Sequence, residues 1–271
     1  MFSPFFLLGA MQMKKTQPAL SVIIAAAGQS TRIGPAATPG ANRPLSRSKK
    51  ATRATAQAPT VRKPFILLRR KPILYYSLET FSSLEETVEI IVAVNEEDFQ
   101  AAIEKLRPRA RKYKISAIVE GGKRRFDSVA LALSAVSPAA GFVAIHDAAR
   151  PFASPDLIRA VLNAAKKTGA AVPALKMSDT IKTASGKGLV DVTLHRSKLR
   201  ATQTPQIFRR DWLLDAYARI SDGHLRPTDD AQVLEAAGYP VALVPGDRFN
   251  IKITHPEDLL FAKAILGKAA K

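Results

Sequence analysis

An acidic and a basic residue stand three positions apart in the stretch IHDAARPF, where Asp147 ends an apolar run and Arg150 follows. A carboxylate at the end of a buried strand can hold a metal ion or a ribose hydroxyl. A guanidinium can clamp a phosphate with two parallel hydrogen bonds. A buried ion pair that shapes a loop is the alternative. His146 alternates away from Asp147 along the run, so we assign it mainly a packing role.

A second candidate for phosphate binding is AAAGQSTRIG, a small-residue loop that follows an apolar run. It lacks the G-x-G-x-x-G pattern of dinucleotide folds and the G-K-[ST] ending of P-loops. Its backbone N–H groups, its hydroxyls and Arg32 can still surround a phosphate. An ordinary strand–helix turn explains the stretch equally well. Lys63, in RKPF, is of interest only together with this loop, because a lone lysine is usually solvated.

A glycine pair in EGGKRRFDSV lets a flat base approach the backbone closely, and Ser128 can hydrogen-bond that base. Arg125 either braces this loop or meets a phosphate. Lys252, in NIKIT, points away from its two isoleucine neighbours if the run is extended. Thr180 and Arg196 flank a predicted hairpin, and Arg196 is either a solvated charge or a residue that completes the site of a neighbouring chain.

The elements that position these residues follow from strand-type runs that alternate with helical patterns. The alternation predicts an α/β fold with a mostly parallel, Rossmann-like sheet and helices on both faces. In such sheets ligands bind at the carboxyl ends of the strands, which is where the candidate residues occur. The helix over 155–168 is expected to begin after an N-cap at Ser154 and to end at Gly169.

The chain reads as one domain over residues 20–266, with an extension over 1–19 that we expect to be disordered and a tail over 267–271. Within the domain, residues 177–203 show short alternating runs around a glycine turn and predict a projecting β-arm. Residues 35–62 carry six basic residues and no acidic one. Their few large aliphatics cannot offset the entropy of ordering, so we predict a disordered basic insert.

Composition excludes several classes of protein. The chain has 271 residues, no cysteine and a formal net charge of +18. Disulfides, zinc ribbons and thiol catalysis are therefore excluded, and a reducing cytoplasm fits. No stretch is long and apolar enough to cross a membrane. The charge raises the possibility of a nucleic-acid-binding protein. Because the sequence lacks interleaved aromatics and any nucleic-acid-binding motif, we expect no specific binding of nucleic acid. No His, Asp and Glu cluster has metal-site spacing.

Taken in order, eight stretches resemble the 2-C-methyl-D-erythritol 4-phosphate cytidylyltransferases of the non-mevalonate isoprenoid pathway. The stretches are AAAGQSTRIG, KPFILL, GGKRRFDSV, HDAARPF, DTIK, TQTPQIF, TDDAQVLEAAG and NIKITHPEDL. The resemblance implies a nucleotidyltransferase-type fold, a reaction between CTP and methylerythritol phosphate that releases pyrophosphate, and a need for Mg²⁺. It also implies a homodimer in which the arm donates Arg196 to the partner's site.

The resemblance further implies a role for each candidate residue. Arg32 and Lys63 would stabilise the pentacoordinate α-phosphate, and Arg196 and Lys252 would position methylerythritol phosphate. Asp147, Arg150 and Thr180 would face the ribose, the metal or the second substrate, with Asp147 as the one metal ligand. The residues around CTP would be Ala26, Ala27, Gly28, Gln29, Ser30, Gly122, Arg125 and Ser128.

The chain departs from the family's pattern in three places. Thirty residues separate Arg32 from Lys63, where the family usually has a short loop. Lys123 and His195 stand where acidic residues are common. A cytidylyltransferase for ribitol 5-phosphate or another sugar phosphate is the alternative enzyme.

Overall fold

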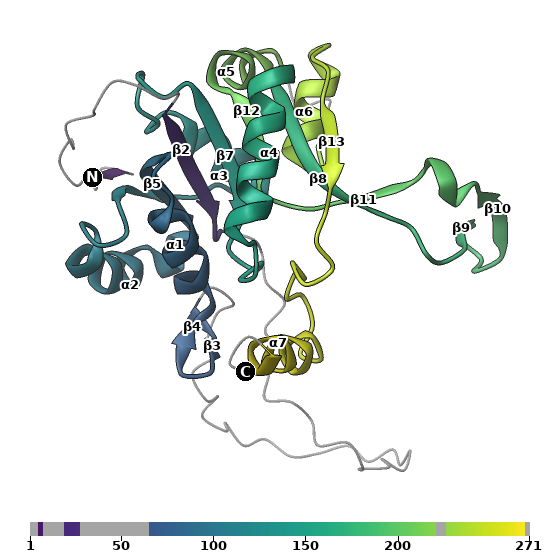
Figure 1. Cartoon of the computed structure of the whole chain (residues 1–271), viewed down its shortest axis with the longest axis horizontal. Helices are drawn as coiled ribbons and strands as arrows, with labels where there is room; N and C mark the ends of the chain where they lie inside the picture. The colour runs from purple at the N-terminus through teal and green to yellow at the C-terminus, as the bar shows by residue number, and fades with distance from the viewer. Residues whose placement is uncertain (1–4, 8–18, 28–64, 221–225, 269–271) are drawn as a thin grey trace, which may run out of the picture.

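A nine-stranded sheet forms the centre of the computed structural model, which describes residues 5–7, 19–27, 65–220 and 226–268 (Figure 1). The strand order along the sheet is β1-β6-β5-β2-β7-β12-β8-β11, and β13 pairs with β8. Four neighbouring strands run parallel, which confirms the mostly parallel sheet. They are β2 (Leu20–Ala25), β5 (Thr87–Val94), β6 (Ile115–Glu120) and β7 (Phe142–Asp147).

The other half of the sheet mixes directions. β12 (Gln206–Arg209) runs antiparallel to both β7 and β8 (Ala170–Lys176), whereas β13 (Ala242–Pro245) runs parallel to β8. β11 (Arg200–Thr202) pairs antiparallel with β8. The connection from β8 to β11 therefore leaves the sheet and returns to it.

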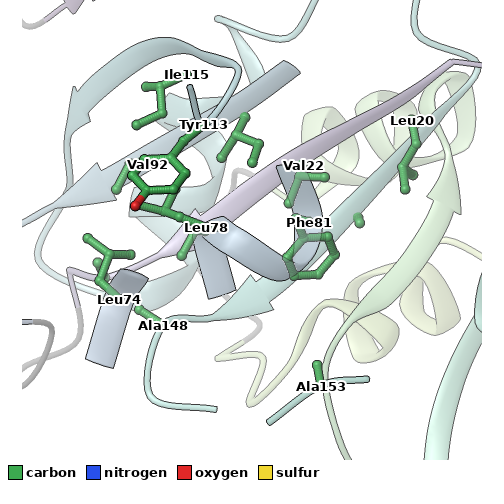
Figure 2. Packing of buried hydrophobic residues seen from close by; sticks show 14 of the residues in the cluster. Leu20, Val22, Leu74, Leu78, Phe81, Val92, Tyr113, Ile115, Ala148 and Ala153 are labelled. Carbon is green, nitrogen blue, oxygen red and sulfur yellow. The ribbon is translucent and has the colours of Figure 1, made fainter. Parts of the chain in front are cut away.

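Helices cover both faces of the sheet, as predicted, because alternate residues of each strand point to opposite sides. Val22 and Ile24 of β2 join one buried cluster, and Ile23 joins the other. Figure 2 shows Leu74, Leu78 and Phe81 of one helix packed in the first cluster. The helices are α1 (Ile73–Ser83), α2 (Glu96–Leu106), η2 (Arg107–Arg109), α3 (Arg125–Leu133), α4 (Pro155–Thr168), α5 (Arg210–Arg219) and α6 (Asp230–Ala236).

Helix α4 begins and ends where its sequence predicts. The Ser154 hydroxyl accepts a hydrogen bond from the N–H of Leu157 at 3.2 Å, a cap whose loss typically costs about 1 kcal/mol. Gly169 ends the helix with φ at 89°, in the left-handed region. A Cβ atom at this glycine would lie 2.3 Å from the ring of Trp212, so both the backbone and the packing require glycine.

The predicted arm forms a two-stranded antiparallel sheet of β9 (Ile181–Ala184) and β10 (Val190–Leu194). It projects away from the body of the molecule (Figure 1). A single turn, η3 (Arg196–Lys198), follows β10. The arm ends earlier than the expected residue 203, because β11 already belongs to the main sheet.

The two ends of the described chain differ from expectation. We expected residues 1–19 to be disordered, but Phe5–Leu7 form β1, which pairs antiparallel with β6 at the edge of the sheet. The last helix, α7 (Asp258–Lys268), extends past residue 266 and packs near the hairpin of β3 (Leu67–Leu68) and β4 (Lys71–Pro72). The predicted insert over 35–62 lies outside the described residues. None of the described helices is long and apolar enough to cross a membrane.

Candidate active site

The carboxyl ends of β2, β6 and β7 meet at one edge of the sheet. Backbone hydrogen bonds continue past the strands, from Ala26 N to Ala93 O at 2.7 Å and from Gly121 N to Val94 O at 2.7 Å. A Cβ atom at Gly121 would lie 2.4 Å from the Cβ atom of Ala27 and 2.7 Å from Ser128 Oγ. Only glycine fits at position 121, and its small size brings the ends of β2 and β6 against helix α3.

Four residues predicted to surround cytidine come together at this junction: Ala26, Ala27, Gly122 and Ser128. Ser128 is buried, and its hydroxyl donates to the Arg124 carbonyl at 3.0 Å. Gly121 is an additional member that the sequence signalled only as half of a glycine pair. The other expected members, Gly28, Gln29 and Ser30, lie outside the described residues, as do Arg32 and Lys63.

Asp147 is the centre of a cluster of cations. Its carboxylate lies 2.7 Å from Lys252 Nζ, 3.0 Å from Arg125 Nε and 4.0 Å from Arg150 Nε. Burial by itself raises the pKa of this carboxyl, but Arg125, Lys252 and Arg150 together lower the pKa below its ordinary value. Asp147 is therefore a carboxylate at neutral pH, and the structure brings together four residues that the sequence singled out.

Arg125 bridges two carboxylates in the interior. Its Nη2 atom lies 2.7 Å from Asp230 Oδ2 while its Nε atom contacts Asp147, and the Tyr217 hydroxyl donates to Asp230 Oδ1 at 2.7 Å. Burial lowers the pKa of Arg125, but Asp230 and Asp147 raise it further, so the net shift is upward. Of the two roles we considered for Arg125, these contacts support the brace. Sequence reasoning missed Asp230, whose only signal was its place in TDDAQVLEAAG.

Arg150 points along the edge of the sheet toward the segment before Lys252. Its Nη1 atom donates to the Asn250 carbonyl at 2.8 Å, and its side chain is mostly buried. Lys252, in contrast, has a side chain that is 41% exposed. A ligand that arrives from solvent therefore meets the ammonium of Lys252 before it meets the guanidinium of Arg150.

His146 lies behind this cluster, as its packing assignment predicts. The imidazole is fully buried and contacts Phe81 edge-on, with ring centroids 5.0 Å apart. Burial lowers the pKa of His146 to about 4, although the neighbouring Asp147 acts in the opposite direction. The imidazole is therefore neutral at physiological pH.

Thr180 and Arg196 lie on the arm and belong to a separate region of the described chain. The Arg196 side chain donates from Nη1 to the Ser178 carbonyl at 2.6 Å and is exposed. The structure thus places the described site residues in two groups, one around the buried Asp147 at the sheet edge and one exposed on the arm.

A divalent cation held by the protein alone does not fit the described residues. They contain no group of three or more His, Asp and Glu side chains that could hold a metal. Both oxygens of the Asp147 carboxylate already face cationic side chains. One shared carboxylate suits a metal that arrives with substrate phosphates better than a resident metal.

An open α/β sheet whose carboxyl edge gathers cations around one buried carboxylate defines a protein that binds anionic ligands at that edge. Comparison with known proteins makes the class specific. Residues 50–268 match the sequence model of the family described as IspD, 2-C-methyl-D-erythritol 4-phosphate cytidylyltransferase. The chain belongs to this family. The match begins after β2, although β2 lies at the centre of the sheet.

Individual relatives agree with the family assignment. The 2-C-methyl-D-erythritol 4-phosphate cytidylyltransferase of Dehalococcoides mccartyi strain CBDB1 is 42% identical over 209 residues, which cover 76% of this chain and 88% of that protein. The enzyme of the same name from Geobacillus kaustophilus is 40% identical over 205 residues, covering 76% and 89%.

Solved structures with the same fold include a cytidylyltransferase of this name from Thermus thermophilus, with a TM-score of 0.66 and 36% identity over 76% of this chain and 94% of that one. The 4-diphosphocytidyl-2C-methyl-D-erythritol synthase from Anaerococcus prevotii has a TM-score of 0.72 at 29% identity and covers 92% of this chain and 96% of that one.

Proposed function

We propose that this chain transfers a cytidylyl group from CTP to 2-C-methyl-D-erythritol 4-phosphate, in the synthesis of isoprenoid precursors. A phosphate oxygen of the acceptor forms a bond to the α-phosphorus of CTP, and the bond to the bridging oxygen of the β-phosphate breaks. The products are 4-diphosphocytidyl-2-C-methyl-D-erythritol and pyrophosphate. The observation that carries the proposal is the Lys252–Asp147–Arg150 cluster at the strand edge of a member of this family.

The main obstacle to this reaction is electrostatic repulsion between the two anionic substrates, and the cations of the cluster can offset it. Two unit charges about 4 Å apart repel each other by about 4 kcal/mol at an effective dielectric constant near 20. A phosphomonoester and a triphosphate bring several such pairs together, so cations must offset the repulsion. The nucleophile is already ionised and needs no general base. Catalysis then consists of positioning and stabilisation of charge.

The described residues divide this work between them. Ala26, Ala27, Gly122 and Ser128 are proposed to surround cytidine at the junction where Gly121 packs closely against Ala27 and Ser128. Lys252 is the exposed cation proposed to hold the acceptor phosphate. Asp147 orients Lys252 through their ion pair, and Arg150 supports the same edge. Arg32, Lys63 and the loop of Gly28, Gln29 and Ser30 are proposed to surround the phosphates of CTP.

Mg²⁺ is the proposed cofactor, carried by the phosphates of CTP, with Asp147 as its one protein ligand. When bound, the ion would neutralise charge on the triphosphate. Because CTP is a cytoplasmic nucleotide and the chain has no cysteine, we place the reaction in the cytoplasm.

The active form is proposed to be a homodimer in which Arg196 and Thr180 serve the partner's site. Support comes from the arm, where the apolar side chains of Leu189, Val190 and Val192 are 66, 62 and 52% exposed in the single chain. Exposed apolar side chains on a projecting hairpin are typical of a surface that another protein covers.

A pyrophosphate-release assay with CTP, Mg²⁺ and each acceptor tests the activity. We expect turnover with methylerythritol phosphate and little with ribitol 5-phosphate. Turnover with ribitol 5-phosphate alone would replace the proposed acceptor. Release that needs neither acceptor would contradict transfer altogether.

A mixing experiment tests the shared site. Arg196→Ala and Lys252→Ala chains are each expected to be nearly inactive. In a mixed dimer, one of the two sites would combine an intact Lys252 with an intact Arg196 from the other chain. Random mixing should then restore about a quarter of wild-type activity, since about half of the dimers are mixed and each has one complete site. No restoration in verified mixed dimers would place Arg196 in the site of its own chain.

A further inference from the structure

A closed ring of hydrogen bonds lies behind Asp147 and joins three separate parts of the chain. His146 Nε2 contacts the Arg150 carbonyl at 2.9 Å, and His146 Nδ1 contacts Thr204 Oγ1 at 3.2 Å. Asn250 Nδ2 donates to the Thr204 carbonyl at 2.8 Å. Arg150 Nη1 donates to the Asn250 carbonyl at 2.8 Å and closes the ring.

The directions of these bonds are mutually consistent. The Arg150 carbonyl can only accept, so the Nε2 atom of a neutral His146 must carry its hydrogen. The Nδ1 atom is then an acceptor and takes the hydroxyl hydrogen of Thr204. The same hydroxyl oxygen accepts the N–H of Asp147 at 3.0 Å. Each side chain in the ring therefore has a defined orientation, and the ring reaches the backbone of Asp147.

The ring is also shielded from water. His146 and Asn250 have no exposed surface, and Thr204 is 5% exposed. A buried polar group that loses its partner costs about 1–3 kcal/mol, so an arrangement with all four contacts made is favoured over partly broken ones. Packing of the His146 ring against Phe81 further restricts it.

The ring connects directly to the segment that carries Lys252. Asn250 precedes Lys252 by two residues, and the N–H of Ile253 donates to the Ala149 carbonyl at 2.9 Å. These two attachments hold the extended segment against the turn after Asp147. Lys252 leaves the segment between them, and its ammonium meets the Asp147 carboxylate.

We propose that His146 and Asn250 are positioning residues, which hold Asp147, Arg150 and Lys252 in register at the edge of the sheet through this ring. The identity of the acceptor bound at this edge rests on the proposed function. The relative positions of Asp147, Arg150 and Lys252 do not depend on it. A ring that only stabilises the core is the competing explanation.

Two variants break the ring at different points. Asn250→Ala removes the amide that holds Thr204. His146→Phe keeps an aromatic ring against Phe81 and removes both hydrogen bonds. As a matched control, Val161→Ala creates a cavity under helix α4, in a buried position that takes no part in the ring. Urea unfolding first establishes how much stability each variant loses.

Kinetics then separate positioning from stability. We expect kcat/KM in both ring variants to fall about ten- to a hundredfold, the range for a small displacement of a positioned group. The KM for methylerythritol phosphate should rise more than the KM for CTP, because Lys252 is the group displaced. His146→Gln, which keeps a donor for the Arg150 carbonyl, should recover part of the loss. The Val161→Ala control should leave both KM values unchanged.

Chemical labelling, which needs no catalytic activity, tests whether the ring holds Lys252 against Asp147. Acetylation by acetic anhydride, followed by mass spectrometry, gives the labelling rate of Lys252 relative to Lys187, an exposed lysine of the arm. Breaking the ring should free Lys252 from Asp147 and raise this ratio severalfold, with no change in the control. If His146→Phe or Asn250→Ala fails to fold, His146→Gln and Asn250→Ser take their place.

An unchanged labelling ratio in the folded ring variants would overturn the proposal. The proposal would also be overturned if the ring variants changed the KM for methylerythritol phosphate and the KM for CTP equally, and by no more than the Val161→Ala control does. If the wild-type chain does not turn over methylerythritol phosphate, the proposed function fails, and the labelling ratio still decides on the ring.

Discussion

The two groups of candidate residues differ in how the single chain holds them. At the sheet edge, Asp147 is buried and contacts Arg125, Arg150 and Lys252. On the arm, Arg196 is exposed and its side chain donates to a carbonyl of the arm itself. The edge is therefore arranged before any ligand binds. The arm presents its arginine on an exposed surface, which we propose a second chain completes.

This contrast has a physical basis in the dielectric environment. Buried charges interact strongly but are costly to leave unpaired, so each must be matched within the fold. Exposed charges are screened and contribute little to stability, so the fold leaves them available for a ligand or a partner. Substitutions at the two regions should therefore differ in kind, with stability lost when a buried charge of the edge is removed and assembly lost at the arm.

The largest expected effect is on stability and follows from removing the central carboxylate. Asp147→Ala leaves Arg125 buried with one carboxylate fewer, and breaking such a buried pair costs about 3–5 kcal/mol. Urea unfolding followed by circular dichroism measures the loss. The matched control is Asp211→Asn, which breaks an exposed pair with Arg209 and should cost at most about 1 kcal/mol. Equal losses would contradict the contrast.

The next effect is catalytic. Lys252→Ala should lower kcat/KM with methylerythritol phosphate about a hundredfold or more, the range for removing one preorganised stabilising group. The fold should remain intact because the lysine side chain is partly exposed. Steady-state pyrophosphate release gives the rate, and Lys187→Ala on the arm serves as the control. Near-normal turnover by Lys252→Ala would remove this residue from the mechanism.

A third effect concerns pH. Burial lowers the pKa of His146 from its ordinary 6.5 to about 4, so the unfolded chain binds a proton at this residue before the folded chain does. Its contribution to stability is therefore complete above pH 6.5 and decreases as the pH falls toward 4. The decrease is at most about 1.4 kcal/mol per pH unit.

Unfolding free energies measured from pH 7 to pH 4 test this prediction. His146→Gln should flatten the decrease, and Val161→Ala, a buried variant that removes no titrating group, should leave the slope as it is in the wild type. Asp147 affects stability at lower pH than His146 does. Because its pKa is lowered in the fold, its carboxylate stabilises the fold fully above pH 3.8, the ordinary pKa, and this stabilisation is lost as the pH falls below that value. A slope that is the same in all three proteins would contradict the neutral, buried imidazole.

The smallest effect on the single chain is expected at the arm. Replacing Leu189 and Val190 with serine removes apolar surface that is already exposed, so the free energy of unfolding of the monomer should change by less than about 0.5 kcal/mol. The same change should weaken the proposed dimer. Sedimentation velocity over a range of concentrations measures it, and a dimer as tight as the wild type would assign the interface to another surface.

The main lines of the fold and part of the site were predictable from the sequence. Continuous apolar runs predicted the parallel strands, and Ser154 and Gly169 predicted the ends of α4. The rule that ligands bind at carboxyl ends of strands placed Asp147 and Gly122 at the same edge. These predictions succeed because they depend on neighbours within a few residues.

Long-range partners were not predictable in the same way. Arg125 has a local sequence context that suits phosphate binding, yet its position is determined by Asp230 on a distant helix. Asn250 and Arg150 are 100 residues apart and share a hydrogen bond. His146 was assigned to packing because its alternation along the strand reports only the direction of the side chain, whereas Thr204 and the Arg150 carbonyl determine what it does there.

The sequence by itself determined the alternation of the parallel strands with their helices, the chemistry available at each strand end and the family to which the chain belongs. Only the tertiary structure decided which charges are paired, because a pairing depends on distance and burial, and neither is a property of one segment. That is why Lys252 and Arg125 look alike as basic residues in the sequence. In the fold, Lys252 is an exposed cation at the edge of the sheet, and Arg125 is a buried residue that links Asp147 to Asp230.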